Sequence, residues 1–169
     1  MANTPERMSI TRARELVLDG NTERLIDDSR ANDELNQSII EEFRANQGKV
    51  AFPTEEMPVL LLTLTGARTG RTLVRPLCYA RDGDRFVIIA SYGGAPRNPP
   101  WYHNLVANPF VTVEVGTEKF EARAMQAHGA ERDRLFADAA KLMPRFTEYQ
   151  NKTERQIPLF ILTRIDEGN

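Results

Sequence analysis

Cysteine, histidine and tryptophan are scarce in this chain of 169 residues, which has one Cys, two His and one Trp. A single cysteine cannot form an internal disulfide, and the two distant histidines have no metal-ligand spacing. No G-x-S-x-G elbow, G-x-G-x-x-G turn or P-loop pattern occurs. Hydrolysis, a Rossmann dinucleotide site and an NTPase are therefore unsupported, and no metal is expected.

Excess charge of one sign and long apolar runs are also lacking. The net charge is −2 at pH 7, so nothing draws the whole chain to nucleic acid or to an acidic membrane, and an anion site has to be local. No apolar run approaches the ~20 residues that span a bilayer, and the N-terminus lacks the apolar stretch of a signal peptide. These absences predict a cytoplasmic protein without an integral membrane segment, although a peripheral membrane contact stays open.

Length and hydrophobic patterning predict one main domain preceded by a helical extension. A second large domain is not expected at 169 residues. Apolar positions three and four apart predict a helix over 4–18, outside the main core, and another over 35–43. We therefore divide the chain into an N-terminal helical extension, residues 1–33, and a barrel domain, residues 34–169.

Strand patterns begin after Pro58 and follow one another at short intervals. Continuous or alternating apolar residues, separated by turn residues, predict six strands, and apolar positions at helical spacing predict two later helices. The strands are expected at 59–65, 73–81, 85–90, 111–115, 119–124 and 159–165, and the helices at 130–143 and through Phe146 and Tyr149. This order predicts an α+β fold built on a closed or partly closed antiparallel β-barrel with peripheral helices.

The segment from Ser91 to Pro109, SYGGAPRNPPWYHNLVANP, has a composition that suits a ligand site better than a core. Its two adjacent glycines let the backbone approach a flat ligand, and its paired prolines can begin a helix. Trp101 and Asn104 then project from the first turns of that helix. A ligand clamp is the favoured interpretation. The alternative is a rigid crossover in which Trp101 plugs a barrel end, and the two are compatible.

The hairpin between the first two strands, residues 66–71 (GARTGR), is a second candidate. Glycine backbone N–H groups, the Thr69 hydroxyl and two guanidinium groups can bind phosphate or carboxylate oxygens, so the hairpin is a predicted anion cradle. Hairpin tips are also rich in such residues for turn formation alone. Arg75 is more informative, because a charge on an otherwise apolar strand usually has a partner or a ligand.

Together these segments give the order G-x-x-[ST]-G…P-L…D-G-D…S-x-G-G…P-x-W-x-x-N-L-x-A-N-P over residues 36–165. This order resembles the deazaflavin-dependent nitroreductase family, split β-barrel oxidoreductases that use reduced coenzyme F420. The resemblance implies coenzyme F420, an 8-hydroxy-5-deazaflavin, as cofactor, with its phosphate and acidic tail at the hairpin and its ring against the S-x-G-G and W-x-x-N segments. The expected cofactor-binding residues are Arg68, Thr69, Gly70, Arg71, Arg75, Pro76, Ser91, Gly93, Gly94, Trp101 and Asn104.

Three positions depart from the family's pattern. Ala67 stands where a basic residue is common, Leu73 where an Arg is common, and Tyr92 where a Lys precedes the two glycines. Fewer cations should therefore face the acidic tail, and Arg71 and Arg75 are expected to replace them in part. Weaker tail binding, or FMN as the flavin, is the alternative.

The resemblance implies an oxidoreductase that transfers a hydride from reduced coenzyme F420 to an electron-poor organic acceptor: a quinone, an enone or a nitroaromatic. Ser91 is expected to orient the ring, and Tyr149 to donate a proton or to shape the acceptor pocket. A non-catalytic protein that binds coenzyme F420 and an FMN-dependent oxidoreductase are the alternative functions. The expected partner is a small-molecule acceptor rather than nucleic acid, and the expected state is a monomer or homodimer.

Overall fold

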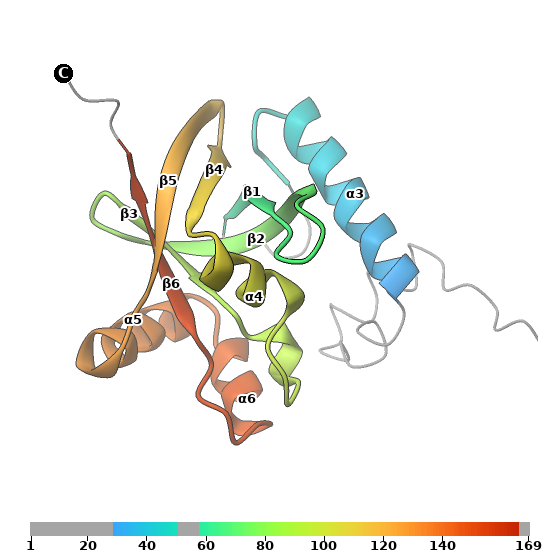
Figure 1. Ribbon diagram of the computed structural model, residues 1–169. Helices are drawn as coiled ribbons and strands as arrows, with labels where there is room; N and C mark the ends of the chain where they lie inside the picture. The colour runs from blue at the N-terminus through green and yellow to red at the C-terminus, as the bar shows by residue number, and fades with distance from the viewer. Residues whose placement is uncertain (1–28, 51–57, 166–169) are drawn as a thin grey trace, which may run out of the picture.

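The computed structural model describes the backbone of residues 29–50 and 58–165, and the side chains of all of these residues except 29–32. The predicted helix over 4–18 lies outside the described residues. The described elements are α3 Ser29–Ala45, β1 Val59–Thr65, β2 Thr72–Asp82, β3 Arg85–Ile89, the 3-10 turn η1 Tyr92–Gly94, α4 Pro100–Ala107, β4 Phe110–Val115, β5 Glu118–Gln126, α5 Gly129–Leu142, α6 Arg145–Asn151 and β6 Leu159–Arg164 (Figure 1).

The six strands form one closed antiparallel barrel in the order β1-β2-β3-β6-β5-β4. β6, the last strand in the chain, is inserted between β3 and β5, and β1 pairs with β4 to close the ring. Leu62 of β1 accordingly pairs with Arg75 on one side and Val113 on the other. The antiparallel barrel predicted from the strand pattern is confirmed, as is the split-barrel fold class that the resemblance implied.

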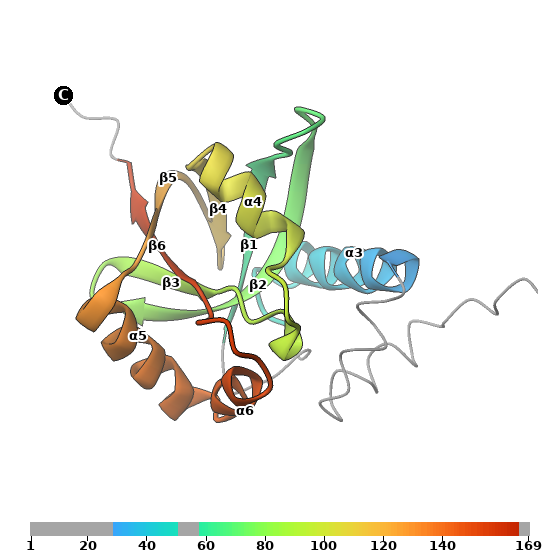
Figure 2. The ribbon, with the colours of Figure 1, turned by 60° about the horizontal axis from the view of Figure 1, so that its bottom comes forward.

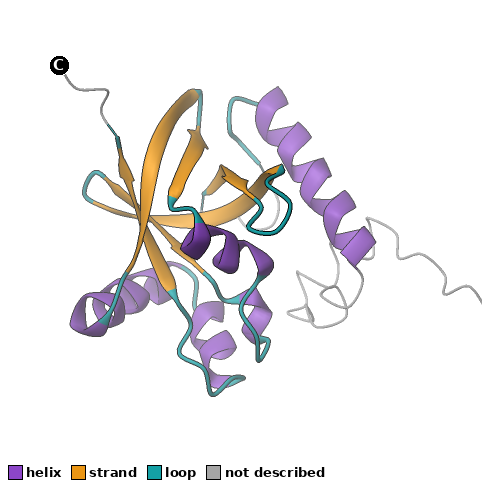
Figure 3. Cartoon of the chain, in the orientation of Figure 1, coloured by secondary structure: helices purple, strands orange, loops and turns teal. Residues whose placement is uncertain are grey.

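The barrel interior is filled by the apolar residues that alternate along the strands. Leu60, Leu62 and Leu64 of β1 point inward, as alternation at a period of two requires, and each is at most 2% exposed. Trp101 and Leu105 of α4 belong to the same interior cluster. α4 therefore packs against the barrel interior through its own apolar side (Figure 3).

Helices cover two outer faces of the barrel (Figure 2). α3 lays buried Ile39, Ile40 and Phe43 against the outward residues of β1. α5 and α6 cover the outer side of β3 and β6 with a separate apolar cluster. α3 begins at Ser29, ahead of the apolar stripe that predicted it, so the division drawn between residues 33 and 34 falls inside a helix.

Candidate functional site

The hairpin between β1 and β2 is a tight turn that leaves its arginines outside. The Gly66 N–H donates to the Arg71 carbonyl at 2.8 Å, and the Gly70 N–H donates to the Gly66 carbonyl at 2.9 Å. The Thr69 hydroxyl oxygen accepts the Arg71 N–H at 3.2 Å. Gly70 has a φ of 69°, a left-handed value that suits glycine. Because Thr69 acts here as an acceptor, its hydroxyl proton is still free to donate.

The arginines of the hairpin have no partners within the described part of the chain. Arg68 and Arg71 are exposed and form no ion pair with the residues described. Arg75 is half-buried, and its Nη1 donates only to the neighbouring Val74 carbonyl at 3.0 Å. Arg75 pairs with inward-facing Leu62, so its strand face is the one that lines the barrel interior. These three guanidinium groups retain donors for an anionic ligand.

Pro76 lies on the opposite strand face from Arg75. It pairs with Leu61, which packs toward α3 on the outside of the barrel. The structure therefore does not bring the Pro76 ring together with the inward face of β2.

A single hydrogen bond joins the two segments that the sequence marked. Asn104 of α4 accepts the Ala67 N–H through its side-chain oxygen at 2.9 Å, across 37 positions of sequence. α4 begins with Pro100 directly after Pro99, as the proline pair predicted, and this turn aims Asn104 at the hairpin. Figure 1 shows α4 beside the loop that connects β1 and β2. The hairpin and the 91–109 segment thus form one continuous candidate site.

The loop after β3 has an unusual backbone. Tyr92, Gly93 and Gly94 have consecutive φ values of 47°, 63° and 81°, and Tyr92 is one of the non-glycine residues in the left-handed region. Such a conformation costs energy for a side chain with a Cβ and persists only where its surroundings hold it. A Cβ on Gly94 would lie 2.8 Å from the Tyr149 carbonyl oxygen. The close backbone approach predicted for Gly94 is thus made to α6 in this structure.

Trp101 is packed into the barrel. Its side chain is 8% exposed, and its ring meets Phe160 edge-on at 6.1 Å between centroids. The packing interpretation of Trp101 therefore describes what the side chain does here. A contact of its exposed rim with a cofactor ring stays a prediction.

Tyr149 lies in the outer cluster formed by α5 and α6. It is 7% exposed and meets Phe146 edge-on at 6.4 Å. Burial raises the pKa of its phenol, against a smaller lowering effect of nearby Arg145, so the hydroxyl stays protonated at neutral pH. The backbone of Tyr149 contacts the Gly94 loop, whereas its ring packs on the helix side. Its predicted role in catalysis is untested by this arrangement.

Two arginines make several hydrogen bonds that were not predicted from the sequence. Arg132 of α5 is 7% exposed and donates to the Ile157 carbonyl through Nε and Nη2. Arg155, in the connection between α6 and β6, donates to the loop after β3. The only sequence signal was a charged residue placed just before the buried run that starts at Ile157, which is too weak to identify partners 60 residues away.

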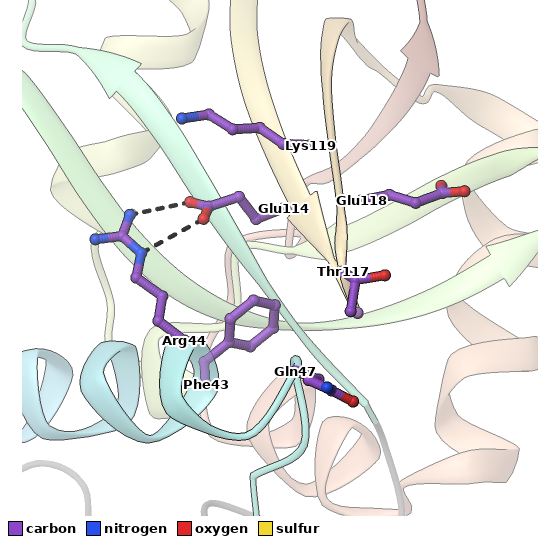
Figure 4. A pocket seen from close by; sticks show the side chains of 8 residues that line it. Phe43, Arg44, Gln47, Glu114, Thr117, Glu118 and Lys119 are labelled. Atoms are coloured by element: carbon purple, nitrogen blue, oxygen red, sulfur yellow. Dashed lines mark hydrogen bonds and ion pairs between the residues drawn. The ribbon is translucent and has the colours of Figure 1, made fainter.

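A pocket of about 200 Å³ lies elsewhere, between α3 and the hairpin of β4 and β5. Arg44 of α3 reaches across it to Glu114, with an ion pair of 3.0 Å (Figure 4). None of the predicted site residues lines this pocket. Because Arg44 and Glu114 already pair with each other and no predicted site residue faces the pocket, we do not place chemistry there.

Metal and thiol chemistry find no support in the described ranges. No group of three His, Cys, Asp or Glu side chains gathers there in a way that could hold a metal ion. Burial raises the pKa of the Cys78 thiol to about 11, which disfavours the reactive thiolate. No helix within 29–50 and 58–165 is long and apolar enough to cross a membrane.

The model of the family described as F420H(2)-dependent quinone reductase matches residues 36–164. The chain belongs to this family. A curated F420H(2)-dependent quinone reductase of Mycobacterium tuberculosis, strain H37Rv, is 46% identical over 126 residues, which cover 72% of this chain and 85% of the relative. A relative of the same description from Mycobacterium bovis has the same identity and coverage. The expected membership of a deazaflavin-dependent oxidoreductase family is confirmed.

Solved structures agree in fold. A reduced-F420-dependent reductase named FDR-A has a TM-score of 0.59 and 37% identity, covering 63% of this chain and 94% of its own. A second, described as a domain-swapped dimer, has a TM-score of 0.61 and 34% identity, covering 73% and 94%. As a member of this family the chain is an F420-dependent oxidoreductase, and coenzyme F420 is its cofactor.

The residues present fit the anionic part of this cofactor. Arg68 and Arg71 are exposed guanidinium groups without carboxylate partners among the described residues, on a turn that Gly66 and Gly70 keep narrow. Guanidinium groups bind phosphate and carboxylate oxygens in pairs, so the donor set suits a phosphate and an acidic tail. Ala67, where a basic residue is common in the family, instead uses its N–H to bind Asn104.

Proposed function

We propose that this protein reduces a quinone to the quinol with a hydride from reduced coenzyme F420, in the cytoplasm, as a monomer or homodimer. The quinone is proposed as the acceptor because the family and its mycobacterial relatives carry that name. Enones and nitroaromatics remain acceptors to be tested. The coenzyme supplies the hydride, so the protein has to bind it, orient it and exclude water.

The observation that carries this proposal is the pair of hairpin arginines that have no partner among the described residues and are held beside α4 by the Ala67–Asn104 hydrogen bond. Arg68 and Arg71 bind the phosphate and the carboxylates of the tail, and the Thr69 hydroxyl donates a further hydrogen bond. Gly70 contributes its left-handed turn rather than its N–H, which is already bonded to Gly66.

Arg75 adds a cation on the inward face of β2, where it can reach the phosphate of the coenzyme. Replacing Arg75 by Leu should weaken binding of the full coenzyme and change little for a deazaflavin without its tail. Equal losses for both ligands would mean a disturbed ring pocket and would overturn this role.

The loop at 91–94 and α4 line the ring in this proposal. Ser91 orients the ring through its hydroxyl, which makes no hydrogen bond to the described residues in the structure. Gly93 and Gly94 present backbone without side chains, and Trp101 borders the ring with its exposed rim. Asn104 has its oxygen committed to Ala67, which leaves its amide N–H₂ for the ligand.

Reduction of a quinone by a hydride also consumes a proton, and Tyr149 is the proposed donor or a wall of the acceptor pocket. Its raised pKa keeps the phenol protonated and therefore able to donate at neutral pH. Tyr149→Phe separates the two roles. Loss of kcat at unchanged coenzyme affinity supports the proton donor, whereas a raised KM for the quinone alone supports the wall.

One experiment tests the function as a whole. The full chain is titrated with coenzyme F420 and with FMN, and oxidation of the reduced coenzyme is then followed with menadione, a cyclic enone and a nitroaromatic in parallel. Binding of F420 with turnover of menadione supports the proposal. Binding without turnover of any acceptor would make the protein a non-catalytic F420 binder, and faster turnover of the nitroaromatic would overturn the quinone assignment.

A further inference from the structure

Arg155 makes an unusually complete set of hydrogen bonds to one loop. Its Nε donates to the Ala95 carbonyl at 2.8 Å, and its Nη2 donates to the Ser91 carbonyl at 2.9 Å. Its Nη1 donates to the Ala90 carbonyl at 3.2 Å and to the Asn98 side-chain oxygen at 2.9 Å. One guanidinium group thus fixes the chain from the end of β3 to the residue before the proline pair of α4.

The partners of Arg155 are neutral. Burial lowers the pKa of its guanidinium, and no charged group acts against that shift. No ion pair to it is present within the described ranges. Instead of a carboxylate, this half-buried cation binds three backbone carbonyls. Such bonds fix backbone geometry, because charge-assisted hydrogen bonds are short and directional.

Arg155 is itself fixed by α5 and α6. Gln150 of α6 donates from Nε2 to the Arg155 carbonyl at 2.8 Å. The oxygen of the same Gln150 side chain accepts the Ile157 N–H at 3.0 Å and Nη2 of buried Arg132 at 3.0 Å. The guanidinium therefore projects from a segment of backbone that α5 and α6 hold in place.

The loop that Arg155 binds has an unfavourable backbone conformation and depends on contacts from outside the loop. The bonded carbonyls of Ser91 and Ala95 flank the left-handed residues 92–94 on both sides. Tyr92 adopts its φ of 47° although it is not a glycine, so the loop would relax to other conformations without outside contacts. A lysine could keep the positive charge, but its ammonium is a point charge without the planar fork that directs separate N–H groups at the acceptors on the two sides of the turn.

We propose that Arg155 is a positioning residue that holds the 91–98 loop in the conformation that receives the deazaflavin ring. This inference rests on the proposed function, which assigns the ring to that loop. Arg155 acts through the loop and does not touch the coenzyme. Its loss should therefore weaken ring binding without changing how the hairpin binds the tail.

The test compares Arg155→Lys and Arg155→Met with a control, Arg134→Met, which removes an exposed arginine of α5 that pairs with Asp82. Dissociation constants are measured by fluorescence for coenzyme F420 and for the tail-less 8-hydroxy-5-deazariboflavin, and amide hydrogen exchange is measured on the cofactor-free proteins. Both Arg155 variants should bind both ligands at least tenfold more weakly. Exchange should rise across 91–98 only, and the control should match the wild type.

Restoration of ring binding by an added guanidinium compound is the measurement that distinguishes positioning of the loop from a general structural role. If Arg155→Met does not fold, Arg155→Lys carries the test, and millimolar methylguanidinium should restore ring binding to whichever variant is folded. The proposal is overturned if Arg155→Lys binds both ligands within twofold of the wild type, or if exchange rises evenly through the barrel. If the wild type binds no F420 while exchange still rises at 91–98 alone, the proposed function fails and the loop clamp stands.

Discussion

The segment at 91–109 and the hairpin at 66–71 meet at the Ala67–Asn104 hydrogen bond, and both are rich in glycine. In the first, a Cβ on Gly94 would collide with the Tyr149 backbone; in the second, nothing lies within 4 Å of the corresponding position at Gly70. The first segment uses its special residues to pack against the protein, whereas the second leaves them in solvent. Substitutions in the first should therefore cost more stability than matched substitutions in the second, where the main effect should be on ligand binding.

The largest effect is expected for Trp101→Ala. The side chain is 8% exposed in the barrel interior, so its truncation should lower the free energy of unfolding by about 3 to 5 kcal/mol. Urea denaturation measures this, with Trp101→Phe as the milder control. If the stability of Trp101→Ala equals that of the wild type and only coenzyme binding is lost, the contrast between the two segments breaks down.

Gly94→Ala and Gly70→Ala form a matched pair for the next prediction. Both glycines have positive φ, 81° and 69°, but only the Cβ at Gly94 would meet backbone, at 2.8 Å. Gly70→Ala should cost about 1 kcal/mol from backbone strain, and Gly94→Ala about 2 to 3 kcal/mol because α6 must also shift. Thermal unfolding of both variants ranks them, and an equal cost would show that α6 gives way freely.

The double variant Arg68→Ala, Arg71→Ala tests what the comparison predicts for the hairpin at 66–71. Unfolding stability should stay within about 0.5 kcal/mol of the wild type, because neither side chain pairs with a described residue. Affinity for coenzyme F420 should fall roughly tenfold, about 1.4 kcal/mol, and the loss should shrink as salt rises. A tail-less deazaflavin serves as the control ligand. Equal losses for both ligands would remove the hairpin from the tail site.

The smallest effect is expected at the hairpin between β2 and β3. Arginines pair with a carboxylate there, unlike those described at the hairpin of residues 66–71. Hydrogen bonds from Arg134 and Arg85 lower the pKa of Asp82 from 3.8 to about 2. Because the folded pKa is the lower one, this carboxylate stabilises the fold above pH 4, and the contribution fades as the pH falls toward 2. Asp82→Asn should cost about 0.5 kcal/mol at pH 7 and nothing near pH 2. A pH series of urea midpoints checks this, and a pH-independent difference would contradict it.

Local patterns were enough to predict the barrel, whereas the meeting of its two marked segments was implied only by the resemblance, which placed one coenzyme across both. Continuous or alternating apolar residues between turn residues predicted all six strands within a few residues. The proline pair predicted the start of α4. Arg75 shares a strand face with Leu73, as a period of two requires, and Leu73 packs against the barrel interior.

What escaped prediction depends on contacts between distant segments. Nothing near Arg155 in sequence indicates that its acceptors lie 57 to 65 residues earlier. The glycine at 94 suggested a ligand, and the backbone it approaches belongs to α6, because a close approach leaves the same signal whichever partner makes it. The ring of Tyr149 packs edge-on against Phe146, and its expected role at the site stays a prediction.

The place of β6 in the barrel has a consequence for synthesis of the chain. β6 closes the gap between β3 and β5 and supplies buried Leu159 and Leu162 to the apolar clusters on both faces of the sheet. Until residues 159–164 have left the ribosome, β3 and β5 each carry an open edge, and the helices α5 and α6 lack part of the surface they cover. A ribosome that pauses before this strand would therefore hold a nascent chain with two unpaired edges, which is the stage at which chaperones have the most to protect.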